Sequence, residues 1–154
     1  MFKTKMFGLL IGIILVLSLV GSALAAGTVT ITKETIPILS TKDRVVLTLV
    51  WTADSSHVLS DATINATTYQ ILGYYLISSE TLSGATAPTD ASVIAIKTAS
   101  GSTLFTMTLS NSTTVGVLTN YQYVNPINGN LTFSLSGNSV NSATGTCKLT
   151  FAAN

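Results

Sequence analysis

The sequence predicts an all-β protein: a single antiparallel β-sandwich, jelly-roll or immunoglobulin-like, preceded by an N-terminal hydrophobic signal helix. Three observations lead to this fold class. Apolar side chains recur with a period of two along most of the chain after residue 26. Short Gly-, Asn- and Pro-containing stretches separate these runs, as expected for strands joined by turns. No window in that part of the chain has the 3.6-residue apolar period of an amphipathic helix.

The first 25 residues have the layout of a secretory signal peptide. Lys3 and Lys5 precede a long apolar run, which ends in small residues up to Ala25. Cleavage there would leave one β-sandwich domain of residues 26–154. The alternative is a retained membrane anchor, because the apolar run just reaches the ~20 residues that a spanning helix requires. We expect an exported protein, at the periplasm, cell surface or outside the cell, with membrane contact only through an uncleaved N-terminal segment.

The clearest strand signal runs from Val45 to Thr52, where both alternating sets of side chains are apolar or β-branched. Such a strand, apolar on both faces, is predicted to be central. Residues 105–109 and 131–136 alternate Phe, Met or Leu with Thr or Ser, so each should keep one face in water. Shorter strands are expected at residues 29–32, 70–78, 93–98 and 121–124, with turns at Gly101, Asn128-Gly129 and Gly137-Asn138.

Cys147 is the only cysteine, so no disulfide can form within the chain. It alternates with Leu149 and Phe151, which predicts a thiol on the buried face of a final strand. The alternative, a reactive or intermolecular cysteine, would need exposure and a nearby base.

Charge is scarce and balanced. The chain has seven Lys and Arg against six Asp and Glu, and after Lys97 its only charged side chain is Lys148. The absence of a basic stripe excludes nucleic acid and polybasic membrane binding as functions. Ser, Thr and Asn must hydrate the surface instead. A surface of low charge density resists association less, so protein assembly or self-association is expected.

One region resembles a known family. An apolar strand at residues 71–77, a Gly-Ala-Thr-Ala-Pro-Thr-Asp loop from Gly84 to Asp90 and an alternating strand at residues 93–97 follow in order. Pro88 fixes φ in this loop. The succession is similar to that of small β-sandwich proteins from the structural gene regions of tailed phages and prophages. The resemblance implies a β-sandwich with a virion-like structural role; the signal peptide departs from it, since subunits assembled in the cytoplasm carry none.

Catalytic chemistry finds little support. Asp54-Ser55-Ser56-His57 contains the residue types of a serine-hydrolase triad, but neighbouring positions in one loop favour a polar turn. Zinc would need more His or Cys, and the Asp residues lack the spacing of a calcium loop. We predict a protein that is not an enzyme, with no catalytic, cofactor or metal site and no cofactor.

Aromatic residues offer the remaining candidate site. Tyrosines can stack on sugar rings, although tyrosines at strand ends more often pack with the core and bond through their hydroxyls. The possible ligand-binding residues are Tyr121, Tyr123, Tyr74 and Tyr75. Two functions therefore remain open: an exported non-catalytic structural or interaction protein on a larger particle or cell surface, or a secreted carbohydrate-binding module with a glycan as partner.

Overall fold

A computed structural model describes residues 26–37, 43–109 and 126–153. The predicted signal helix and the predicted strand at residues 121–124 lie outside these ranges. Within them, no helix is long and apolar enough to span a membrane.

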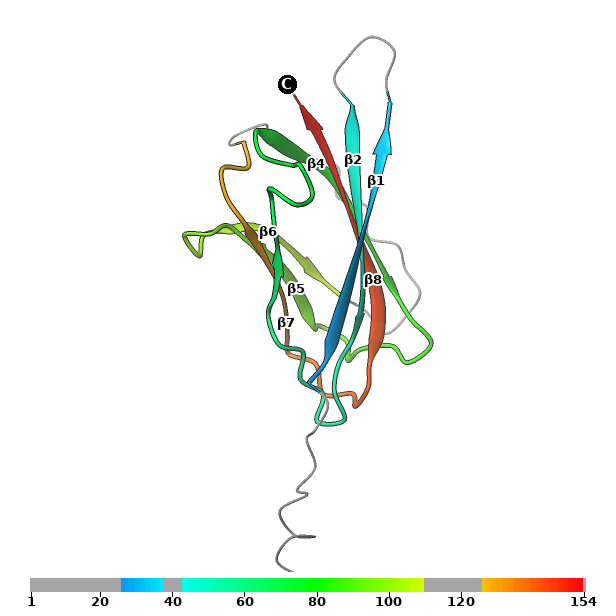
Figure 1. The fold of residues 1–154 in the computed structure, drawn as a ribbon. Coiled ribbons are helices and arrows are strands. Elements are labelled where there is room, and N and C mark those ends of the chain that lie inside the picture. Colours follow the sequence, from blue (N-terminus) through cyan, green and yellow to red (C-terminus); the bar gives the residue numbers. More distant parts are fainter. Residues whose placement is uncertain (1–25, 38–42, 110–125, 154) are drawn as a thin grey trace, which may run out of the picture.

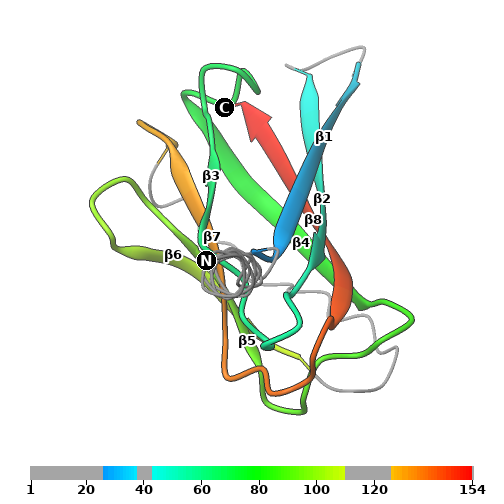
Figure 2. The ribbon, with the colours of Figure 1, turned by 60° about the horizontal axis from the view of Figure 1, so that its bottom comes forward.

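The described chain forms eight strands in two antiparallel sheets (Figures 1 and 2). One sheet has the order β1-β2-β8-β4 and the other has the order β3-β7-β5-β6. The prediction of an all-β protein with two antiparallel sheets is confirmed. The strands are β1 (Thr28–Ile36), β2 (Arg44–Thr52), β3 (Ala62–Ile64), β4 (Tyr74–Ser83), β5 (Val93–Lys97), β6 (Thr103–Thr108), β7 (Leu131–Ser136) and β8 (Thr144–Ala153).

Strand pairing is nested along the chain. The hairpin of β5 and β6 lies innermost, β3 pairs with β7 around it, and β2 pairs with β8 around both. The pairs β4·β8 and β5·β7 then join these ladders side by side within the two sheets. The chain therefore resembles one long antiparallel hairpin folded over into two layers.

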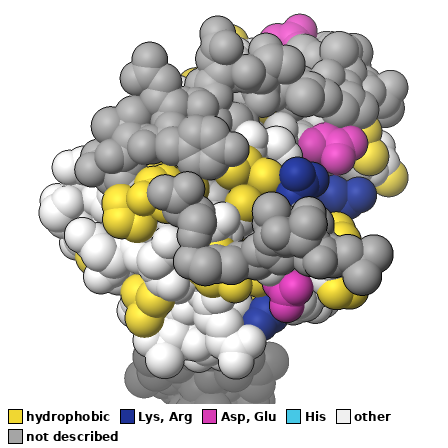
Figure 3. All heavy atoms as spheres, turned by 90° about the horizontal axis from the view of Figure 1, so that it is seen from above, with side chains coloured by type: hydrophobic (Ala, Val, Ile, Leu, Met, Phe, Trp, Pro, Cys, Tyr) yellow, Lys and Arg dark blue, Asp and Glu magenta, His cyan; other side chains and the backbone are white. Residues whose placement is uncertain are grey.

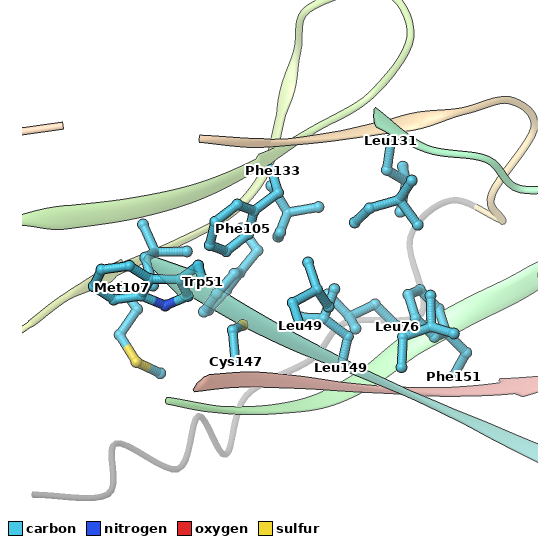
Figure 4. Close-up of a cluster of buried hydrophobic side chains, with 14 of the residues drawn as sticks. Leu49, Trp51, Leu76, Phe105, Met107, Leu131, Phe133, Cys147, Leu149 and Phe151 are labelled. Atoms are coloured by element: carbon cyan, nitrogen blue, oxygen red, sulfur yellow. The ribbon is translucent and has the colours of Figure 1, made fainter. Parts of the chain in front are cut away.

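The core lies between the layers, where side chains from both sheets point toward one another (Figure 4). The period of two places every second residue of β2 and β8 on this inner face, which explains the alternating burial along both strands. Cys147 is buried among them, as predicted. The largest fully buried side chains are Trp51, Phe133, Phe151, Leu47, Leu49, Ile64, Ile71, Ile94, Ile96, Leu131 and Leu149, together with Val45.

Trp51 has a fixed place because of a glycine on the neighbouring strand. Gly145 of β8 is its register partner, and a Cβ at position 145 would overlap the indole ring. Trp51 is 0% exposed. Gly145 thus provides the space that lets a large ring lie flat against the sheet.

β2 is central, as predicted. Val50 on its outer face is 49% exposed. Two other strand predictions need correction. The strand expected from residue 70 begins at Tyr74, because Gln70 and Gly73 adopt positive φ values of 55° and 80° in a turn. β1 extends beyond residue 32 to Ile36, and its last residues pair with the start of β2.

Candidate functional site

The Asp54-to-His57 segment forms a tight turn. Asp54 Oδ1 accepts hydrogen bonds from the backbone N–H groups of Ser56 and Val58, both at 2.8 Å. The backbone N–H of His57 donates to the Asp54 carbonyl oxygen at 3.1 Å, and His57 itself has a φ of 63°. The carboxylate therefore holds the turn closed, and the exposed His57 lies at its tip.

Metal-ligating side chains do not gather in the described part of the chain. Among those residues, no three His, Cys, Asp or Glu side chains lie close enough to hold an ion. Asp61 and Asp90, which could supply oxygen ligands, are exposed in separate loops.

Cys147 has the environment of a packing residue. Burial raises the pKa of its thiol to about 12, and the neighbouring Thr81 side chain opposes this rise less strongly. Because the thiolate is the nucleophile and metal ligand, a thiol with this pKa stays neutral and unreactive at physiological pH.

The described tyrosines of the candidate site do not form one platform. Tyr74 and Tyr75 are consecutive residues at the start of β4, so their side chains leave opposite faces of the sheet. Tyr74 is paired with Ala153 on the inner side, and Tyr75 with Ala152 on the outer side. Both are half-buried. Tyr121 and Tyr123 lie outside the described residues.

A hollow of about 470 Å³ lies beside Tyr74 at the rim of the sandwich. Its other lining residues are Asp43, Leu72, Gly73 and Ala153, and the Leu72 side chain is 48% exposed. The hollow is open to solvent, so it would cover only part of a small ligand. An aromatic ring, a carboxylate and an aliphatic side chain share this hollow. Asp43 and Leu72 were not predicted, since they come from turns whose side chains meet Tyr74 only in the folded chain.

A broad surface of the described chain is the outer face of the β1-β2-β8-β4 sheet. Registered pairs place Thr28 beside Thr52, Thr30 beside Val50 and Thr32 beside Thr48, and β8 continues these rows. We call the outward-facing residues of these four strands the threonine face. Its eight threonines are Thr28, Thr30, Thr32, Thr48, Thr52, Thr144, Thr146 and Thr150.

Apolar side chains interrupt the hydroxyls of the threonine face. Val50 is 49%, Leu82 42% and Ile36 41% exposed, and all three belong to this face. Seen from above, the charged side chains in sight lie on one side of the view, next to hydrophobic ones, and the other side is white and yellow (Figure 3).

The chain matches no protein-family model, and no curated protein is similar enough in sequence to count as a relative. The fold defines a two-sheet, all-β protein with one core. Its function has to be inferred from that fold and from the surfaces just described.

Proposed function

We propose that the protein is an exported, non-catalytic structural or interaction protein that packs on, or decorates, a larger particle or cell surface. The threonine face carries this proposal. It combines hydroxyl groups and exposed aliphatic side chains over four strands, which suits contact with another neutral surface. The polar residues that sequence patterns singled out for chemistry, Asp54 and His57, serve a turn.

The nested strand pairing supports a jelly roll as the specific fold. A jelly roll is a double sheet of eight strands built from two Greek keys, and capsid and lectin domains use it. In an immunoglobulin domain, the sheet that starts with the first two strands continues with the fifth and fourth. Here it continues with the last strand and then with β4. The likeness of the Gly84-to-Asp90 region to tailed-phage proteins and the signal-peptide layout add the virion-like and exported parts of the proposal.

Gradient fractionation of a native culture tests this function. Peptide mass spectrometry on soluble, membrane and particle fractions would follow the protein and identify its N-terminus. We expect the chain in a particle or cell-wall fraction, beginning at Ala26. A protein found only free in the medium would contradict a role in assembly, and an intact N-terminal apolar run in membranes would contradict cleavage.

Carbohydrate binding is the second candidate, and the hollow beside Tyr74 favours it. A sugar could stack on the Tyr74 ring while its hydroxyl groups donate to the Asp43 carboxylate. Titration with a panel of neutral glycans, followed by amide chemical shifts, would test this. Shifts that are centred on Gly73 and Tyr74, and are lost in Tyr74→Ala but retained in Tyr75→Ala, would support the module. A flat response to every glycan would exclude it.

A further inference from the structure

The threonine face is electrically neutral in total. It contains four charged side chains, and Glu34 and Glu80 balance Arg44 and Lys148. An anionic partner such as a nucleic acid would gain nothing from this balance. Two copies of the same face, in contrast, would meet with no net repulsion between them. Charge therefore favours a neutral partner, and a second copy of this chain meets that condition.

The size of the threonine face also fits a pair of copies. Four strands of about nine residues, with a rise of about 3.3 Å and a spacing of about 4.8 Å, cover about 30 by 19 Å. Two such faces would bury about 1,100 Å² in total, just above the ~1,000 Å² that a specific interface needs and below the ~1,600 Å² that is typical of stable complexes. This area predicts a weak dimer that forms as the protein becomes concentrated.

The apolar residues support the same occupant. Three of the five large hydrophobic side chains that are exposed in the described chain belong to this face, namely Ile36, Val50 and Leu82. Val50 lies on β2, an inner strand, with Thr30 and Thr146 as its neighbours on the two flanking strands. Covering these side chains would remove apolar area from water, while the threonine methyl groups would pack between them.

We propose that the threonine face is the surface through which two copies of this chain pair, face to face and with the same face on both partners. This inference rests on the proposed structural function, and the partner it adds is a second copy of the same chain. Because such an interface is isologous, a charge introduced near its two-fold axis meets its own copy across the dimer, and we place Val50, on the inner strand β2, near that axis. Identical charges therefore repel one another, and opposite charges attract.

Val50 allows a test with a matched control. Val58 is also a valine and is 52% exposed, but it lies in the turn after β2, outside the four strands of the face. We would express the full chain, purify the resulting protein and measure its sedimentation velocity at low salt. The concentration would run from about 5 to about 500 μM, because dimers with interfaces of this area are weak. Val50→Glu and Val50→Lys are each expected to raise the dimer dissociation constant at least tenfold. Val58→Glu and Val58→Lys should leave it unchanged.

Mixing the two Val50 variants isolates contact between copies. An equimolar mixture of Val50→Glu and Val50→Lys should form a heterodimer with a dissociation constant within about threefold of the wild-type value, since opposite charges now meet within a Debye length. A fold defect in either variant could not be repaired by mixing. Circular dichroism of each variant alone would confirm that both remain folded.

Several outcomes would overturn the pairing. A wild-type protein that stays monomeric over the whole concentration range would do so, as would equal effects at Val50 and Val58, or a mixture no tighter than its components. Different results would contradict the proposed function. A monomer that still co-sediments with particles would refute the pairing alone, whereas a dimer recovered only free in the medium would refute the assembly role.

Discussion

Replacing Gly145 by alanine tests the packing of the core against the β1-β2-β8-β4 sheet. The new Cβ would overlap two carbons of the Trp51 ring and would lie 3.0 Å from the carbonyl oxygen of Leu82. Trp51 is fully buried among close-packed neighbours, so the ring has little room to move aside. We therefore expect Gly145→Ala to destabilise the protein through overpacking.

The expected loss follows from two opposing effects. Overpacking a well-filled core typically costs about 1–3 kcal/mol. Replacing glycine inside a strand by alanine returns roughly 0.5–1 kcal/mol, because glycine loses more conformational freedom on folding. The free energy of unfolding should fall by about 1–2 kcal/mol. In a Trp51→Phe background the smaller ring leaves space, so the same substitution should be neutral or slightly stabilising.

The assay is urea unfolding followed by far-UV circular dichroism, because Trp51 is the single tryptophan and its fluorescence is lost in one background. Gly101→Ala is the control: its φ of 82° disfavours alanine, but no atom lies within 4 Å of the added Cβ. Its cost should be the same with Trp51 and with Phe at that position. Equal costs of Gly145→Ala in both backgrounds would refute the packing argument, since contacting residues should couple.

Three further predictions concern the thiol, the turn and the sheet edge. The pKa of Cys147 rises from 9.0 unfolded to about 12 folded, so the stability that the neutral thiol contributes is complete below pH 9 and is lost as pH rises toward 12. The free energy of unfolding, measured as a function of pH, should fall less over that range for Cys147→Ala than for the wild type. Equal slopes of the two curves would contradict the raised pKa of Cys147. Asp54→Ala removes the acceptor of two backbone N–H groups and should cost about 1–2 kcal/mol in urea unfolding, whereas Asp54→Asn should retain most of the stability; a neutral Asp54→Ala would rule out the turn-closing role. Lys33 on the edge strand β1 faces inward beside Leu47 and donates a hydrogen bond to the Gln70 side chain. Inward-facing charges on edge strands oppose edge-to-edge pairing between molecules. Lys33→Met should therefore increase light scattering on storage with little change in melting temperature. Unchanged scattering would argue against that role.

Local patterns predicted most of the strands. β6, β7 and β8 each carry a regular alternation of apolar and polar residues, β2 and β5 are mostly apolar runs, and the structure has strands at all these positions. β3 has only three residues, too few to display a period. The strand expected from residue 70 begins later, at Tyr74. Ile71 and Leu72 are apolar like strand residues, although they lie in the turn before the strand.

The surfaces of the protein could be predicted only in part, because they combine residues from several strands. Alternation alone shows that Tyr74 and Tyr75 leave opposite faces, so their separation could have been predicted. The threonine face could not, because β8 joins β2 across nearly the whole chain, and only the register of that pairing aligns Thr146 with Val50.

The proposed role of this two-sheet protein is to join a larger assembly through its threonine face. The most direct measurement is gradient fractionation of cultures that carry the wild-type chain or the Val50→Glu variant, with the chain quantified by mass spectrometry. We expect wild-type protein in the dense particle or cell-wall fractions and a shift of the variant toward the soluble fractions. Wild-type protein that remains entirely free at the top of the gradient would contradict it.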